Sequence, residues 1–177
     1  MTRLLVFLLL IFFSSCLSLK PAATKSKSSI METFFVGDEG LQYFIKPMCF
    51  QSTSKNKCYL DLTFRHKTKI EGMVTANISI QTDSQLKSIN RIIISNVTHE
   101  LVLDEMNFMF MKDSKKQFTS RFTTSIPLED ISKLFINEQW QIEIQLTQGN
   151  ELFYPAKRTK KIINKINQTI FINHLNN

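Results

Sequence analysis

Strict alternation of apolar and polar side chains is the feature that most constrains how this chain folds. In the segment CYLDLTF, the apolar residues Leu60, Leu62 and Phe64 alternate with polar ones. Side chains of a β-strand point to its two faces in turn, so this pattern predicts a strand with one buried face. The segments GMVTANISIQT and WQIEIQL repeat the pattern. In the latter, the residues predicted to be buried are Trp140, Ile142, Ile144 and Leu146, and those predicted to be exposed are Gln141, Glu143 and Gln145.

Seven or eight short segments of this kind, separated by polar turns, follow one another along the chain. They predict a mainly β fold, an antiparallel two-layer β-sandwich that is immunoglobulin-like in the loose sense. The Cys…Trp…Cys spacing of a true immunoglobulin domain is missing from the sequence. No internal repeat or linker divides the chain after Met31, so residues 31–177 are predicted to form a single β-rich domain.

Two segments depart from this alternation and predict helices. In the segment SIPLEDISKLF, Ser125 is a candidate N-cap, a proline lies in the first turn, and apolar residues recur at helical spacing. The C-terminal segment from Ile162 to Leu175 also spaces its apolar residues at helical intervals. We therefore expect one short amphipathic helix and a closing C-terminal helix that packs on the sheet or caps its open end.

The N-terminal segment is typical of an export signal. A positive start at Arg3 precedes ten apolar residues, 4–13, and small residues follow. Ten residues rise only about 15 Å as a helix, roughly half of a bilayer core, so a permanent span is not expected. Two cleavages are compatible with this pattern. Either residues 1–15 are removed and Cys16 is lipidated, or an ordinary signal peptidase cuts after Cys16 or Ser18 and adds no lipid.

The stretch that follows favours the lipidated alternative. The string SLKPAATKSKSS is too polar to bury a core, so residues 16–30 are predicted to be a flexible tether that spans about 20 Å. The sequence Phe-Ser-Ser-Cys that ends at Cys16 resembles the lipobox of small envelope lipoproteins from Bacteroidota-like bacteria, with Phe13 where most such boxes carry leucine. Many of these proteins carry β-sandwich domains of unassigned function. The resemblance implies a lipid anchor, and because residues 17–20 include no acid, it implies a protein that faces the periplasm.

The two remaining cysteines, Cys49 and Cys58, flank the loop sequence FQSTSKNK. An exported protein encounters an oxidising compartment, where an even number of thiols tends to pair. We therefore predict a disulfide that joins two neighbouring antiparallel strands. Two alternatives stay open: free buried thiols, or a metal site, which the absence of a nearby histidine before His66 disfavours.

Basic residues are concentrated at the C-terminal end of the chain. No Asp or Glu occurs between Pro155 and Asn177. The five residues that form the candidate contact with an anionic surface are Lys157, Arg158, Lys160, Lys161 and Lys165. Such a run is compatible with anionic lipid headgroups, a polyanionic glycan or an acidic envelope protein, and also with a helix face that is merely solvated. Nucleic acid is not expected as a partner, because the protein is predicted to be exported and no aromatic residues interleave with the lysines.

No catalytic or metal-binding constellation is recognisable along the chain. The three histidines, His66, His99 and His174, are not within metal-ligand spacing of one another, and no nucleophile or phosphate-loop motif occurs. The acidic residues Glu100, Asp104 and Glu105 do not match a calcium loop. We predict no catalytic residue, no metal and no cofactor. Three glycosylation sequons begin at Asn77, Asn96 and Asn167.

These observations lead to three functional hypotheses. The first is an exported, lipid-anchored envelope protein that acts as a non-catalytic binding or scaffolding module. The second is a secreted β-sandwich without a lipid, such as a glycosylated extracellular ligand. The third, disfavoured because no motif supports it, is a small hydrolase of unrecognised type.

Overall fold

The computed structural model describes residues 30–37, 40–66, 72–114, 117–147 and 149–172. The predicted signal peptide, Cys16, the tether up to residue 29, His174 and Leu175 lie outside these ranges. Within them the chain forms ten strands, two α-helices and one π-helical turn. The strands are β1 (Met31–Phe35), β2 (Leu41–Ser52), β3 (Lys57–His66), β4 (Met73–Thr82), β5 (Arg91–Ser95), β6 (Glu100–Leu103), β7 (Asn107–Ser114), β8 (Gln117–Pro127), β9 (Gln141–Leu146) and β10 (Gly149–Pro155). The helices are α2 (Leu128–Leu134) and α3 (Lys157–Ile166), and the π-helical turn is Asn167–Phe171.

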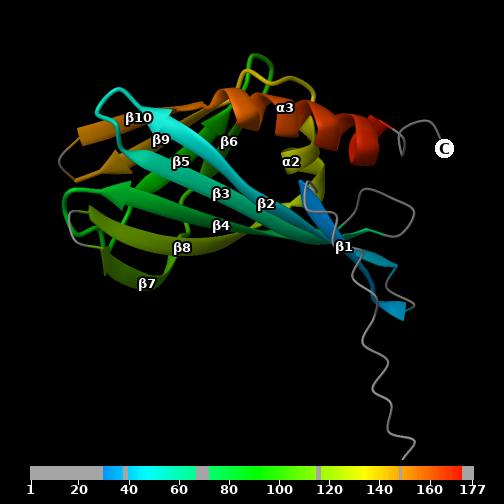
Figure 1. Ribbon diagram of the computed structural model, residues 1–177, viewed down its shortest axis with the longest axis horizontal. Coiled ribbons are helices and arrows are strands. Elements are labelled where there is room, and N and C mark those ends of the chain that lie inside the picture. The colour runs from blue at the N-terminus through cyan, green and yellow to red at the C-terminus, as the bar shows by residue number, and fades with distance from the viewer. Residues whose placement is uncertain (1–29, 38–39, 67–71, 115–116, 148, 173–177) are drawn as a thin grey trace, which may run out of the picture.

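All ten strands belong to one antiparallel sheet in the order β6-β5-β9-β10-β2-β3-β4-β8-β7, with β1 paired to β2. The two end strands, β6 and β7, are consecutive in the chain and are separated only by residues 104–106. Such a link spans at most about 14 Å, so the sheet must curl until its two ends approach each other. Figure 1 shows the resulting half-barrel. The predicted mainly β, antiparallel fold with one short helix and a C-terminal helix is confirmed, and its two layers are opposing parts of one curled sheet.

The alternation predicted for β9 is confirmed. Ile142 and Ile144 point into the core and are essentially inaccessible to solvent, as is Trp140 just before the strand. Leu146 is only partly buried, because it lies at the end of the strand. The outward-facing residues are half-buried rather than exposed, because β9 lies between β5 and β10, whose side chains flank them. Glu143, for example, accepts a hydrogen bond from Asn150 of β10.

Strand β2 bends in its middle, and one of its edges pairs with a different strand on each side of this bend. The pairing with β3 shifts register between Ile45 and Met48, where Pro47 stands. A proline cannot donate a hydrogen bond to a neighbouring strand, so it is tolerated at such an irregularity. One edge of β2 pairs with β1 before the bend and with β10 after it. Strand β2 therefore supports both the N-terminal end of the domain and the start of the segment that leads into α3.

The short helix α2 forms where it was predicted, but Ser125 is not its N-cap. Ser125 belongs to β8, which continues to Pro127, and Pro127 itself occupies the N-cap position without a side-chain hydrogen bond. The backbone stays extended there because Ser125 pairs with Thr75 of β4. Pairing with the sheet thus overrides the local capping preference of serine. The buried residues of α2 are Leu128, Ile131 and Leu134.

The C-terminal helix closes the open side of the curled sheet, as expected (Figure 1). Its buried residues are Thr159, Ile162, Ile163 and Ile166. The π-helical turn that follows α3 determines which of its side chains reach the core. In a regular α-helix, Phe171 would lie about 140° around the axis from Ile166 and would point away from the core. The wider π turn keeps both Ile170 and Phe171 buried.

Aromatic rings form a continuous chain through the core. Consecutive ring centroids lie 5.3 Å apart (Tyr43–Phe64), 6.3 Å (Phe64–Phe171), 5.2 Å (Phe171–Phe135), 4.8 Å (Phe135–Trp140) and 6.3 Å (Trp140–Phe50). These contacts connect β2 and β3 with the end of α2, the start of β9 and the π-helical turn. Every buried hydrophobic residue of the described chain lies between residues 43 and 171. A chain without residues 1–16 therefore retains this entire core.

Candidate functional site

The five basic residues predicted to contact an anionic surface all lie on α3, and all five are exposed. We call this set, Lys157, Arg158, Lys160, Lys161 and Lys165, the basic face. At about 100° per residue, the basic face covers an arc of roughly 160° of the helix. The buried residues, from Thr159 to Ile166, lie on the opposite side. The isoleucines therefore determine which side of the helix meets the sheet, and the cations necessarily point outward.

The attachment of α3 to the sheet holds the basic face in a fixed orientation. The Cys49 carbonyl oxygen of β2 accepts two hydrogen bonds at the start of the helix. One comes from the Ala156 backbone N–H at 3.0 Å, and the other from the Thr159 hydroxyl at 2.7 Å. Thr159 is buried, so its hydroxyl requires such a partner. Together with the buried isoleucines, these bonds fix both the position and the rotation of α3.

The charges of the basic face are not neutralised by the rest of the described chain. None of its five residues forms an ion pair with a carboxylate among residues 30–37, 40–66, 72–114, 117–147 and 149–172. One acidic residue contacts this side of α3 indirectly. Glu138 accepts a hydrogen bond of 2.6 Å from the amide of Asn164, which lies between the lysines on the outward side of α3. One carboxylate thus partly offsets the field of five cations.

The position of two of these cations is unfavourable for the helix itself. The first turn of α3 contains Lys157 and Arg158 and no acidic residue. Because the N-terminal end of a helix carries a partial positive charge, cations there destabilise the helix by roughly 0.3–1 kcal/mol each when exposed. The helix dipole therefore adds to the positive potential of the basic face instead of reducing it.

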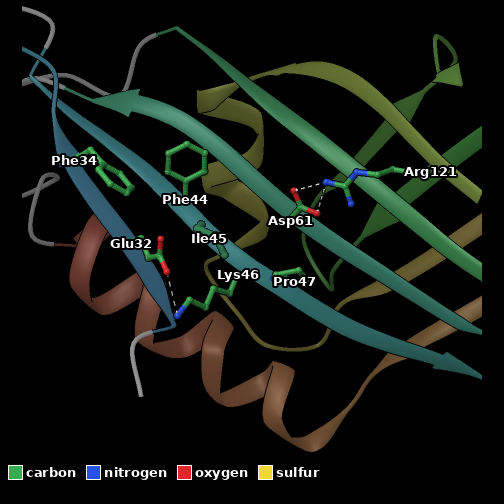
Figure 2. A pocket seen from close by; sticks show the side chains of 8 residues that line it. All are labelled: Glu32, Phe34, Phe44, Ile45, Lys46, Pro47, Asp61 and Arg121. Atoms are coloured by element: carbon green, nitrogen blue, oxygen red, sulfur yellow. Dashed lines mark hydrogen bonds and ion pairs between the residues drawn. The ribbon is translucent and has the colours of Figure 1, made fainter. Parts of the chain in front are cut away.

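The outer face of the sheet carries a shallow pocket of about 420 Å³. Figure 2 shows two phenylalanine rings and two pairs of charged residues around it. Arg121 donates to both carboxylate oxygens of Asp61, at 2.9 and 3.1 Å, and Lys46 pairs with Glu32 at 3.5 Å. Because its charged side chains already pair with one another, the pocket presents no charge without a partner, and we assign it no ligand.

The predicted disulfide between Cys49 and Cys58 is wrong: both residues are free thiols. In the β2–β3 pairing, Cys58 is opposite Phe50, whereas Cys49 is opposite Tyr59. Adjacent residues of a strand point to opposite faces, so the Cβ atoms of the two cysteines point apart and cannot be bridged without moving the backbone. Cys58 is fully buried in the core, and this burial raises the pKa of its thiol far above the usual range.

The histidines and acidic residues noted in the sequence do not converge. His66 is the last residue of β3, and His99, in the loop between β5 and β6, is partly buried. Asp104 pairs with Arg91. Among the residues described, no group of three or more His, Cys, Asp or Glu side chains is placed to hold a metal ion.

Two of the three sequon asparagines use their side-chain amides within the fold. Asn77 donates a hydrogen bond to Asp61 at 2.9 Å. Asn96 donates to the carbonyl oxygens of Lys133 and Leu134 at 3.1 and 2.9 Å. A glycan on either nitrogen would replace at least one hydrogen and disturb these bonds. Asn167 is the C-cap of α3 and is partly buried.

No helix in the described part of the chain is long and apolar enough to cross a membrane. No known family model, curated protein or solved structure matches the chain.

Proposed function

We propose that the protein is an exported, lipid-anchored envelope module that catalyses no reaction and binds an anionic surface or partner through the basic face of α3. In this proposal Cys16 carries the lipid, residues 16–30 form the tether, and the β-rich domain faces the periplasm. The domain serves as a scaffold that holds the basic face in one orientation.

The observation that supports this proposal is the arrangement of charge on α3. Five exposed cations lie opposite the buried isoleucines, and they lack ion-pair partners in the described chain. A lysine or arginine next to an anionic leaflet contributes about 1 kcal/mol, and the effect decays within a Debye length of roughly 8 Å. Several cations on one rigid face therefore act together on an anionic surface, whereas cations dispersed over a domain do not.

The proposed anchor and the basic face would have different roles. The two acyl chains of a diacylglyceryl group are enough for stable attachment, so the basic face would orient the attached domain on the membrane. A tether of about 20 Å would keep the domain close enough to the membrane for the basic face to reach it.

The first prediction concerns the N-terminus of the mature protein. We expect mass spectrometry to find Cys16 as the first residue, with a diacylglyceryl group on its sulfur. An unmodified N-terminus at Leu17 or Leu19 would contradict the anchor and would favour the alternative of a secreted protein without a lipid.

The second prediction concerns the chain without residues 1–16, which removes the lipid but keeps the described core. We expect this protein to float with vesicles that contain phosphatidylglycerol and not with vesicles of phosphatidylcholine alone, because the basic face requires an anionic surface. Equal and negligible flotation with both kinds of vesicle would show that the basic face does not bind an anionic lipid surface.

A further inference from the structure

Two exposed isoleucines lie near the C-terminal end of α3. Ile172 follows the π-helical turn directly and is 42% exposed, and Ile136, in the loop after α2, is 63% exposed. Isolated apolar residues on a surface need no explanation. These two are of interest because both lie next to the C-terminal part of the helical segment that carries the basic face.

The π-helical turn determines where Ile172 points. Its two preceding residues, Ile170 and Phe171, are buried against the core. A further residue along the helix turns by roughly 80–100°, so the side chain of Ile172 leaves the buried side and points outward. The same irregularity that keeps Phe171 in the core therefore leaves an exposed isoleucine just after the C-terminal end of the helical segment.

The loop that carries Ile136 is held against the same part of α3 by contacts on both sides. The Phe135 ring packs on the Phe171 ring with 5.2 Å between centroids. Two residues after Ile136, the Glu138 carboxylate accepts the hydrogen bond from Asn164. Residues 135–138 therefore run beside the C-terminal half of α3, and Ile136 projects from this loop into solvent.

We propose that the basic face, Ile136 and Ile172 form one interfacial membrane-binding surface, with the cations at the lipid headgroups and the two isoleucines in the adjacent acyl region. This inference rests on the proposed function and specifies its partner as an anionic lipid leaflet. A soluble polyanion offers charge but no apolar phase. Cations bordered by exposed aliphatic side chains are complementary to a bilayer interface, where both kinds of group gain free energy.

The test compares two supports for the chain without residues 1–16. One support consists of vesicles containing phosphatidylglycerol, and the other is heparin, a soluble polyanion without an apolar phase. We expect the double variant Ile136→Ser and Ile172→Ser to bind the vesicles on the order of tenfold more weakly, because two partly exposed aliphatic side chains no longer enter the lipid. Its affinity for heparin should remain within about twofold of the unaltered chain, since its charge is unchanged.

A control variant, Met109→Ser, removes another exposed apolar side chain, which is 50% exposed. Met109 lies on the edge strand β7, away from α3 in Figure 1, so this change should alter neither affinity. Thermal melting of each variant checks that the fold is retained.

If the double variant binds vesicles as well as the unaltered chain does, or loses the same affinity for vesicles and for heparin, the two isoleucines do not enter the lipid. Either result would contradict the proposed membrane-binding surface but would not contradict the proposed function. Failure of the unaltered chain to bind either support would overturn both proposals.

Discussion

Truncation of Trp140 to alanine is expected to lower the free energy of unfolding by about 3–5 kcal/mol. The side chain is 1% exposed and contacts the rings of both Phe50 and Phe135. Its indole N–H also donates to the carbonyl oxygens of Leu134 and Asn137, at 2.7 and 3.0 Å. The substitution therefore leaves a cavity in the middle of the aromatic chain and also removes the hydrogen bonds that hold the end of α2 against β9.

Urea denaturation followed by far-ultraviolet circular dichroism measures this effect, because the variant lacks the only tryptophan of the chain. Trp140→Phe is the matched control. It keeps an aromatic ring in place but removes the N–H donor, so it should lose less stability than the alanine variant. A loss below roughly 1 kcal/mol for the alanine variant would show that Trp140 is not a central packing residue, since large losses require a cavity or a broken buried contact.

Much of the fold was predictable because the sheet has one buried face almost everywhere. The alternation in β3, β4 and β9 repeats the two-residue period of a strand, and no other regular structure buries such a set of residues. Helix α3 was predictable for the same reason, since its isoleucines repeat at the helical period. The curl of the sheet was not predictable from these local patterns. It follows from which strands pair, and in particular from the short link between β6 and β7.

The disulfide prediction failed because strand register depends on the geometry of the turn. A shift of one residue in the β2–β3 pairing would reverse which side chains share a face. The sequence around Cys49 and Cys58 shows two strands and a polar loop but does not specify this register. In the structure Phe50 rather than Cys49 is opposite Cys58, and the two thiols are on different faces.

The segment FMFM, residues 108–111, is a short continuous apolar run, a pattern that is also compatible with a strand buried on both faces. In the structure it belongs to β7, a terminal strand of the sheet that pairs only with β8. Phe108, Met109 and Phe110 are consequently 43–50% exposed. Hydrophobicity indicated the strand, but its burial was decided by its place in the sheet.

The basic residues of the candidate site were predictable from the sequence, whereas its surroundings were not. A run of lysines without acids is visible in the chain, and the spacing of the isoleucines shows which side of the helix is buried. The contact of Glu138 with Asn164 joins residues 26 positions apart, and it depends on how the loop after α2 packs on α3. No local signal specifies such a contact, so neither the partial neutralisation nor the position of Ile136 was foreseen.

Replacement of four lysines of the basic face by glutamine is expected to weaken binding to anionic vesicles on the order of a thousandfold. The changed residues are Lys157, Lys160, Lys161 and Lys165. Each contributes up to about 1 kcal/mol next to an anionic leaflet, so four contribute up to about 4 kcal/mol. Stability should change little, because all four side chains are exposed and lack ion-pair partners in the described chain.

A matched control variant carries the same change of net charge elsewhere on the surface. Four exposed lysines outside α3 are replaced by glutamine in this variant, namely Lys55, Lys57, Lys87 and Lys112. Charges more than a Debye length from the bound surface are largely screened, so this variant should bind anionic vesicles within about threefold of the unaltered chain.

The affinity of the unaltered chain and of these two variants for anionic vesicles, measured at low and at physiological salt, tests the proposed function most directly. All three proteins lack residues 1–16, so no lipid anchor contributes. We expect only the variant in α3 to lose binding, and we expect the affinity of the unaltered chain to fall as salt rises. Equal weakening in both four-lysine variants would show that net charge and not the basic face binds the membrane, and this result would contradict the account.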